Sequence, residues 1–323
     1  MTRLALLAAV AVIAGCSSPS SAPSVPTKPT GHRTAHTLDL QGHRGARGLR
    51  PENTLPSFEI ALDVEVTTLE LDLHLSSDDQ LIIWHDPVLE TTKCVIPPEL
   101  ASHKVRELTA AQLATVRCAK NPAPDRFENQ VATATALAGD NYYIVTLDAL
   151  FDFVDRYATD PTKSESQRIN AAKIRFNIET KRKVADPTAI DDGFDGSKAG
   201  TFELALVAII RDRELAKRIT VQSFDHRSLW SVRAIAPDLP LAALTEERTD
   251  LAALFDKGAA VWSPDYKVVG PAELQQAHAL GMEIIPWTVN DPADMRALLE
   301  LGVDGLISDR PDLMVEVARA QQL

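Results

Sequence analysis

Three acidic residues stand where predicted parallel strands would end. Glu70 and Asp72 are two residues apart in the apolar segment Thr67–Leu73, so their side chains lie on one face of a strand. Glu179 ends a second apolar segment, Lys173–Glu179. Three converging carboxylates repel one another unless protons or a cation intervene, and an all-oxygen set favours Ca²⁺ or Mg²⁺ over zinc. Alone, each acid could equally be salt-bridged or solvated, so the pattern suggests a metal site without requiring one.

Two histidines stand beside these acids in the predicted arrangement. His43 and His85 each end a predicted strand. Histidine titrates near neutral pH, so two of them can act as a general base and a general acid. Arg44 and Lys181 could neutralise phosphoryl oxygens. A lone histidine at a strand end is normally a structural hydrogen bonder, and we assign the other six, His74 among them, to the surface or to such structural roles.

Apolar β-branched segments alternate with helical patterns along the chain, which predicts a parallel sheet with crossover helices. The predicted strands are Leu38–His43, Thr67–Leu73, Lys173–Glu179, Arg218–Ser223, Leu239–Leu244, Ala259–Pro264, Glu283–Thr288 and Val303–Ser308. The predicted helices are Thr54–Val64, Leu147–Tyr157, Phe202–Arg213, Arg227–Ile235, Asp250–Phe255, Pro271–Leu280 and Pro292–Leu301. Eight strands fit one closed α/β barrel of the (β/α)8 TIM-like type, whose sites lie at the carboxyl ends of the strands.

A ninth apolar segment needs a place outside the barrel. The turn residues 76–79 separate Leu71–Leu75 from Leu81–His85, so these two segments are predicted to pair as a hairpin on the barrel rim. A turn centred on residues 78 and 79 sets Asp72 about opposite His85. The hairpin would thus return His85 to the place where the acidic residues emerge.

The stretch from about residue 90 to 141 lacks the alternation of strand and helix patterns seen elsewhere in the chain, and it is rich in proline. We predict that it is an insertion over the top face, with one helix near Ala110–Arg117. Long insertions on that face commonly shape substrate access.

The N-terminal segment has the pattern of a bacterial lipoprotein signal. Residues 1–15 combine Arg3 with a short apolar run, and the run ends before Cys16 in a sequence that resembles a lipobox. Residues 16–36, rich in Ser and Pro, are predicted to be an extended tether, followed by a barrel domain over residues 37–323. The resemblance implies a lipid on Cys16. The protein would then be exported and anchored to the cell envelope, on its periplasmic or outer-surface side, with the lipid as its membrane contact.

Two further cysteines are predicted to pair. Once Cys16 is set aside, Cys94 and Cys118 remain, and an oxidising compartment favours a disulfide between them; two buried free thiols are the alternative.

The net charge of −12 argues against a nucleic-acid partner, because phosphate backbones select basic surfaces. A small phosphate ester needs only local positive charge.

An ordered set of motifs resembles the glycerophosphodiester phosphodiesterase family. In the first half the motifs are His43-Arg44-Gly45-Ala46, Pro51-Glu52-Asn53-Thr54, Ser57-Phe58, Glu70-Leu71-Asp72 and His85-Asp86-Pro87. In the second half they are Asn177-Ile178-Glu179-Thr180-Lys181, Gln222-Ser223-Phe224, Pro286-Trp287-Thr288-Val289-Asn290 and Asp304-Gly305-Leu306-Ile307-Ser308-Asp309. The resemblance covers about residues 40 to 313. It implies a TIM-like barrel, a Ca²⁺ or Mg²⁺ ion, and the release of glycerol 3-phosphate and an alcohol from small glycerophosphodiesters.

The resemblance also implies roles for individual residues. By motif, His43 and His85 become the acid–base pair, Glu70, Asp72 and Glu179 the metal ligands, and Arg44 and Lys181 the phosphate-binding residues. Trp287 could wall the glycerol pocket or belong to the core. Two other functions remain open: a phospholipase D-like action on membrane sphingolipids, and a non-catalytic lipoprotein that binds a partner at the cell surface.

Overall fold

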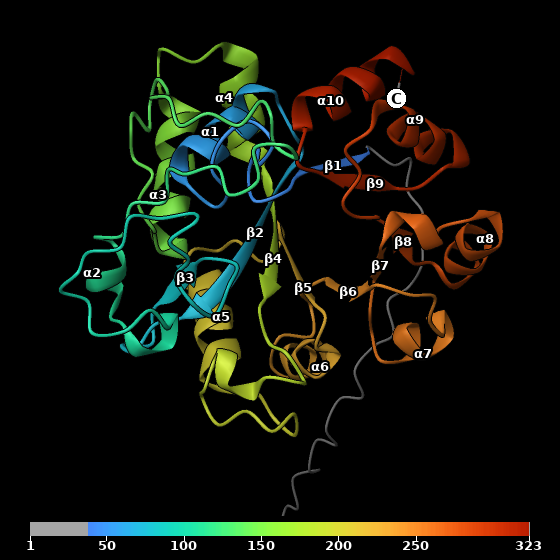
Figure 1. Cartoon of the computed structure of the whole chain (residues 1–323). Coiled ribbons are helices and arrows are strands. Elements are labelled where there is room, and N and C mark those ends of the chain that lie inside the picture. Colours follow the sequence, from blue (N-terminus) through green and yellow to red (C-terminus); the bar gives the residue numbers. More distant parts are fainter. Residues whose placement is uncertain (1–37, 323) are drawn as a thin grey trace, which may run out of the picture.

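The computed structural model describes residues 38–322, in which parallel strands and helices alternate around a barrel (Figure 1). The barrel strands are β1 (Asp39–Gly42), β2 (Thr68–Leu75), β4 (Arg175–Thr180), β5 (Ile219–Ser223), β6 (Leu241–Thr245), β7 (Val261–Pro264), β8 (Glu283–Ile284) and β9 (Gly305–Ser308). Their order in the sheet is β8-β7-β6-β5-β4-β2-β1-β9. The predicted signal peptide (1–15), Cys16 and the tether (16–36) lie outside the described residues.

The two edges of this sheet meet and close the barrel. β8 covers only the first two residues of the predicted strand Glu283–Thr288, but the chain beyond it continues alongside β9. The amides of Asp304 and Ile307 donate to the carbonyls of Ile284 and Pro286, each at 3.0 Å, and the Val289 amide donates to Ile307 at 2.9 Å. Together with the order of the strands, these bonds confirm the predicted (β/α)8 TIM-like barrel.

Helices cross between successive strands and cover the outside of the barrel. They are α1 (Leu55–Asp63), α3 (Leu147–Thr159), α4 (Glu165–Lys173), α5 (Thr201–Asp212), α6 (His226–Ile235), α7 (Leu251–Asp256), α8 (Pro271–Leu280), α9 (Pro292–Leu301) and α10 (Pro311–Ala320). Side-chain caps start several of them, as when the Thr54 hydroxyl accepts from the Ser57 amide at the start of α1. Each helix predicted between barrel strands is present to within about two residues at either end. Two were not predicted, α4 and α10, and Lys173, predicted to begin a strand, instead ends α4.

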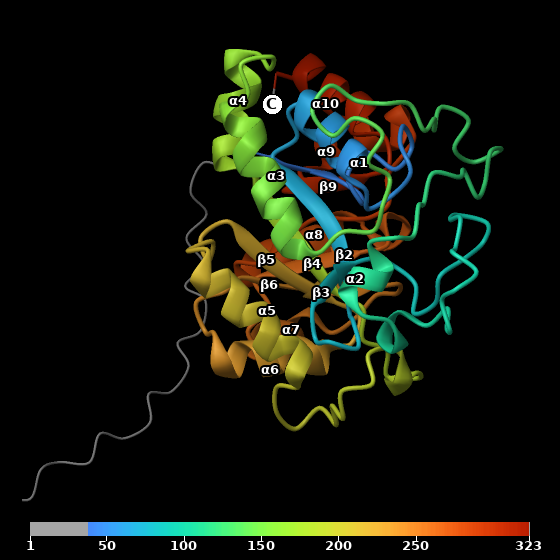
Figure 2. The same ribbon diagram turned by 90° about the vertical axis from the view of Figure 1, so that its left-hand side faces the viewer.

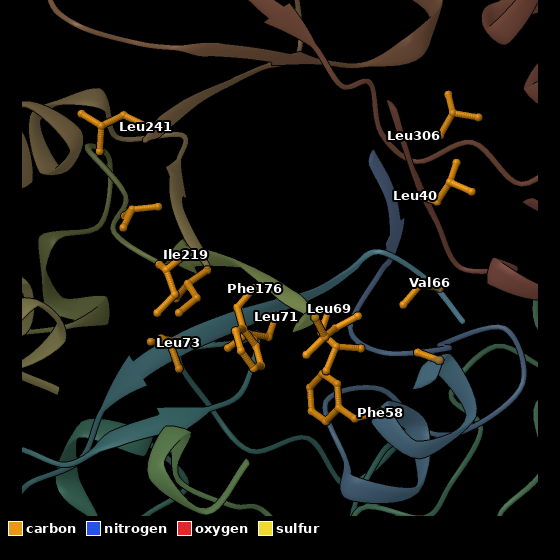
Figure 3. Packing of buried hydrophobic residues seen from close by; sticks show 14 of the residues in the cluster. Leu40, Phe58, Val66, Leu69, Leu71, Leu73, Phe176, Ile219, Leu241 and Leu306 are labelled. Atoms are coloured by element: carbon orange, nitrogen blue, oxygen red, sulfur yellow. The ribbon is translucent and has the colours of Figure 1, made fainter. Parts of the chain in front are cut away.

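Alternation along β2 sorts apolar from acidic side chains. Leu69, Leu71 and Leu73 are fully buried and point out of the barrel, toward the layer that contains Phe58 of α1 (Figure 3). Because successive side chains on a strand face opposite sides, Glu70 and Asp72 project inward. The hydrophobic core therefore lies between the strand and the helix layer, and the acidic side chains lie inside the barrel.

The predicted rim hairpin is present, with its register shifted by one residue. β3 (Leu81–Ile83) pairs antiparallel with the end of β2, and Leu73 lies opposite Ile83. Asp72 therefore lies opposite Trp84 instead of His85, and its carbonyl accepts from the Trp84 amide at 3.0 Å. The shift arises because the Ser76 amide bonds to the Gln80 carbonyl, which centres the turn on Asp78.

The insertion follows the hairpin and lies beside the carboxyl end of β2 (Figure 2). It contains the short elements η1 (Val105–Glu107) and α2 (Ala110–Leu113), so the predicted helix Ala110–Arg117 is shorter than expected. Cys94 and Cys118 form a disulfide, and both belong to a small apolar cluster that also contains Trp84. The insertion thus has a core of its own. Two further short turns are η2 (Pro187–Ala189) and η3 (Tyr266–Val268).

Among the described residues, no helix combines the length and the apolar character that a membrane crossing requires.

Candidate active site

A cavity of about 260 Å³ opens at the carboxyl ends of the barrel strands. Seven of the residues predicted from the sequence line it: His43, Arg44, Glu70, His85, Glu179, Lys181 and Trp287. Asp72 lies fully buried between Glu70 and Glu179. The insertion adds Arg126 to the wall. The barrel therefore brings all the predicted catalytic, metal-binding and phosphate-binding residues to one place.

The three acids form a compact buried cluster. One carboxylate oxygen from each of Glu70, Asp72 and Glu179 lies within 4.8 Å of the others. Burial raises the pKa of Glu70 well above its ordinary value, and the charges of Asp72 and Glu179 raise it further. Burial also raises the pKa of Glu179, to about 7, against the opposing charge of Lys181. This repulsion in a dry site is relieved by protons or a cation, so the cluster could hold a metal ion.

Polar neighbours fix the orientation of these carboxylates. Glu70 accepts from the Gln222 side-chain amide at 2.7 Å and from the Arg44 backbone amide at 2.9 Å. Asp72 accepts from the Asn53 side-chain amide at 2.8 Å through Oδ2, while its buried Oδ1 has no hydrogen-bond partner within the described chain. An acceptor left over in this way is available to a cation.

Two cations lie against the acidic cluster. Lys181 Nζ donates to Glu179 at 2.7 Å and lies 3.5 Å from Asp72 Oδ1. Arg44 Nε lies 3.1 Å from Asp72 Oδ2, and Arg44 also donates to Glu52 at 3.0 Å. Burial would raise the pKa of Asp72, but Arg44 and Lys181 outweigh it and hold the pKa well below its usual range. Asp72 is therefore ionised, and both cations face the cavity.

His43 is oriented by a carboxylate from the far end of the chain. Its Nδ1 lies 2.6 Å from Asp309 Oδ1, and its Nε2 lies 3.9 Å from Glu70. Asp309 also accepts from the Asn290 side-chain amide at 2.9 Å. Burial lowers the pKa of His43 despite the opposing charge of Asp309, so the ring is neutral near pH 7. A neutral ring that donates from Nδ1 presents an unprotonated Nε2.

His85 has the same arrangement with a different partner. Its Nδ1 lies 2.7 Å from Asp86 Oδ1. Burial lowers the pKa of His85, again against an opposing carboxylate charge, that of Asp72. His74, assigned to a structural role from the sequence, is buried, and its Nε2 lies 3.1 Å from the His85 carbonyl oxygen. It therefore supports the backbone that carries His85.

Two aromatic side chains, Phe224 and Trp287, also line the cavity. Trp287 donates from Nε1 to the Ser263 carbonyl at 2.9 Å, which leaves its ring facing Phe224 edge-on with centroids 5.4 Å apart. Leu244 and Ile307 complete this apolar side. Trp287 therefore lies in the cavity wall instead of the buried core.

Comparison with known proteins identifies the family. The family model named Glycerophosphoryl diester phosphodiesterase family matches residues 43–313. The chain belongs to this family. A glycerophosphodiester phosphodiesterase of Bacillus subtilis is 28% identical over 291 residues, which span 86% of this chain and 85% of the relative. One from Caldanaerobacter subterraneus is 24% identical and covers 86% of this chain and 96% of the relative. The protein is thus an enzyme of the phosphodiesterase class.

Solved structures of the family share the barrel. A protein from Silicibacter pomeroyi, assigned as a glycerophosphoryl diester phosphodiesterase, aligns with a TM-score of 0.73 at 26% identity and covers 90% of this chain and 96% of its own. An Oleispira antarctica phosphodiesterase, solved in complex with its product sn-glycerol-3-phosphate, aligns with a TM-score of 0.65 at 18% identity. It covers 87% of this chain and 97% of its own.

Several residues of the site were given no role by sequence reasoning. Asp309, Gln222 and Phe224 stand within motifs of the family resemblance, at or just after strand ends, and that position was the available signal. Lys93 belongs to the insertion and had no signal, because its place depends on how the insertion folds. Glu52 stands within a motif of the family resemblance, two residues before Thr54, which caps α1.

Proposed function

We propose that the protein hydrolyses small glycerophosphodiesters to glycerol 3-phosphate and an alcohol through two-histidine acid–base catalysis that depends on a divalent cation. The observation that carries this proposal is that His43 and His85, each with a carboxylate on Nδ1, line one cavity with a buried acidic cluster. Family membership supports the substrate class. The glycerol 3-phosphate bound to the Oleispira antarctica protein supports the product.

The two histidines supply the proton transfers. Because each ring donates Nδ1–H to a carboxylate, each can accept a proton on Nε2 and carry it as an imidazolium stabilised by that carboxylate. One histidine removes the proton from the nucleophile, which is water or a substrate hydroxyl. The other histidine, which must enter the step as an imidazolium, delivers its Nε2 proton to the oxygen of the departing alcohol as the nucleophile bonds to phosphorus and the old P–O bond breaks. If the nucleophile is a substrate hydroxyl, water then opens the resulting cyclic phosphodiester in a second step, with the two histidines in exchanged roles.

Arg44 and Lys181 bind the phosphodiester. Both are cationic and line the cavity, and each is held by the acids beneath it. Burial would lower the pKa of Lys181, but Glu179 and Asp72 raise it above its ordinary value, so the ammonium stays charged. Positive groups fixed beforehand in a partly dry cavity stabilise the charge that builds on the phosphoryl oxygens.

Glu70, Asp72 and Glu179 would hold the cation. All three donors are carboxylates, the set that Ca²⁺ and Mg²⁺ prefer, and Asp72 Oδ1 has no hydrogen bond from any residue that the structure describes. When bound, such an ion polarises a phosphoryl oxygen as a Lewis acid. We propose Ca²⁺ as the resident ion, with Mg²⁺ as the alternative. Trp287 and Phe224 would lie against the carbon chain of the glycerol.

The test is release of glycerol 3-phosphate from glycerophosphocholine by protein lacking residues 1–16, stripped with chelator and then given Ca²⁺ or Mg²⁺. We expect release only after an ion is restored. Folded protein that releases nothing with either ion contradicts the proposal. A parallel assay with sphingomyelin as the substrate tests the alternative function. Release of choline from sphingomyelin, without release of glycerol 3-phosphate from glycerophosphocholine, would indicate the phospholipase D-like function.

We further propose that the protein is exported and held at the cell envelope by a lipid on Cys16. The lipobox resemblance and the disulfide between Cys94 and Cys118 support an oxidising compartment outside the cytoplasm. Labelled fatty acid should be incorporated by the full chain and not by Cys16→Ser. Equal labelling of both proteins would contradict the anchor.

A further inference from the structure

Lys93 is held rigidly in the insertion at the place where it meets the barrel. Its backbone amide donates to the Glu90 carbonyl, and its carbonyl accepts from the Lys120 amide, both at 3.0 Å. The next residue is Cys94, whose disulfide to Cys118 links two segments of the insertion. The Lys93 side chain is only 12% exposed, and its ammonium lies 5.6 Å from the centre of the Trp84 ring. Its position is therefore set by the fold of the insertion.

The Lys93 ammonium lies between two carboxylates that belong to the active site. It donates to Asp86 Oδ2 and, at 3.1 Å, to Glu52 Oε1. A third carboxylate, that of Glu90, lies 3.7 Å away and is more exposed. Charge-assisted hydrogen bonds of this kind, shielded from water, are the strong ones.

Each of the two inner carboxylates uses its other oxygen to hold a residue of the cavity. Asp86 Oδ1 accepts from His85 Nδ1 at 2.7 Å. Glu52 Oε2 accepts from Arg44 at 3.0 Å and lies 2.7 Å from Arg47 Nε. One ammonium from the insertion therefore connects the support of His85 to the support of Arg44.

We propose that Lys93 is a positioning residue for catalysis, which acts through Asp86 to hold the His85 ring in its productive orientation. This inference rests on the proposed function. Within residues 38–322, the ion-pair partners of Asp86 are Lys93 and His85, whereas Glu52 also has Arg44 and Arg47. Removing the ammonium therefore frees the Asp86 carboxylate, and with it His85, while Arg44 stays in place.

The expected kinetic effect is confined to turnover. Lys93→Met keeps the length of the side chain and removes its charge, and we expect kcat to fall about tenfold with KM changed by less than about twofold. Lys93→Arg should restore kcat to within about threefold of wild type, because it returns a cation to Asp86. Lys104→Met is the matched control, since Lys104 is an exposed lysine of the same insertion, paired with Glu107. It should leave kcat and KM unchanged.

A double-mutant comparison tests the route through Asp86. If Lys93 acts on Asp86, adding Lys93→Met to Asp86→Asn should lower kcat by less than about twofold more, because coupled residues are not additive. Independent, multiplied losses would overturn the proposal. So would a folded Lys93→Met protein with wild-type kcat. Lys93→Gln, which can still hydrogen-bond Asp86 without charge, replaces Lys93→Met if that variant does not fold.

These outcomes are separate from failure of the proposed function. Wild-type protein that releases no glycerol 3-phosphate defeats the proposed function. Active wild-type protein with an equally active Lys93→Met variant defeats only the positioning role.

Discussion

The two histidines have the same local geometry, but two different regions of the molecule produce it. His43 is held by Asp309, whose side chain is 1% exposed and which lies 266 positions away at the end of β9. His85 is held by its immediate neighbour Asp86, whose side chain is 18% exposed and depends on the insertion for its cation. The barrel fixes one of the two proposed catalytic histidines by closing on itself, whereas the other depends on an added segment. The second arrangement should therefore be easier to disturb.

Removing either ring is the largest expected change and should affect both regions alike. His43→Ala and His85→Ala should each lower kcat by about 10³-fold, because each ring transfers a proton in the reaction. The measurement is glycerol 3-phosphate release at saturating metal, with circular dichroism to show that each variant folds. Near-full activity in either variant would remove that histidine from the catalytic pair.

The supporting carboxylates should show the difference between the two regions. Asp309→Asn should lower kcat by about 10²-fold, because the Asp309 carboxylate is buried and water cannot replace the negative charge that stabilises the His43 imidazolium. Asp86→Asn should lower it only about tenfold, because water can reach the partly exposed pair. Steady-state kinetics of both variants give the ratio. Equal losses would mean that burial does not separate the two supports.

Opening the disulfide should affect the insertion side alone. The Cys94–Cys118 link closes a segment with a sequence separation of 24, and its loss should cost about 3 kcal/mol of unfolding free energy on a chain-entropy model. In a Cys94→Ser/Cys118→Ser protein we expect a several-fold lower kcat, because Lys93 adjoins Cys94. Calorimetry and the phosphodiesterase assay measure the two effects. Unchanged kcat in a destabilised protein would show that Lys93 keeps its place without the link.

The attachment of the insertion to α1 should matter for stability and little for turnover. Glu59 accepts from the amides of Leu137 and Ala138, at 2.9 and 2.7 Å, in part-buried hydrogen bonds, and from Lys163 at 2.5 Å in a buried one. Lys163→Met should lower the unfolding free energy by about 3 kcal/mol near pH 7, because it leaves the buried Glu59 carboxylate without its counter-ion. Turnover well below the melting temperature should stay near wild type.

The difference in unfolding free energy between wild type and Lys163→Met should depend on pH, because the ion pair shifts the pKa of Glu59 and that of Lys163. Burial would raise the pKa of Glu59, but Lys163 lowers it below its ordinary value, so its contribution is present above about pH 4.3 and is lost as pH falls further. Burial would lower the pKa of Lys163, but Asp63 and Glu59 raise it, so its contribution is lost only at strongly alkaline pH. Denaturant unfolding at pH 7 and pH 4 should show the gap between wild type and Lys163→Met shrinking at pH 4. A constant gap would contradict the ion pair.

Much of the fold was predictable because the barrel strands and their helices are locally consistent. The leucines of β2 alternate with its acids, and residues such as Asp291 and Pro292 mark where α9 begins. The helix α4 was missed because only Ala171 in it is buried, so it has no apolar stripe; its one signal was the capping box of Ser164 with Gln167. In contrast, α10 has a visible apolar stripe that sequence reasoning did not extend to.

The candidate site was predictable where it uses residues at strand ends. Glu70, Glu179 and His43 follow from the rule that parallel strands end at one face. The contacts that tie the site to distant parts of the chain were not predictable. The pairing of His43 with Asp309 requires barrel closure, and the reach of Lys93 to Glu52 requires the fold of an insertion without regular rhythm. Neither contact can be inferred from residues that are close together in the sequence.

The pairing of β1 with β9 has a consequence for synthesis of the chain. β1 pairs with β9 from Asp39 to Gly42, and the His43 amide donates to the carbonyl of Ser308 at 2.9 Å. A growing chain that has not yet reached Gly305 has no neighbour for that side of β1 and no Asp309 for His43. Premature termination there would leave His43, near the start of the domain, without the carboxylate that orients it, although its neighbours in the sequence are unchanged. Hydrolysis is thus a property of the finished polypeptide.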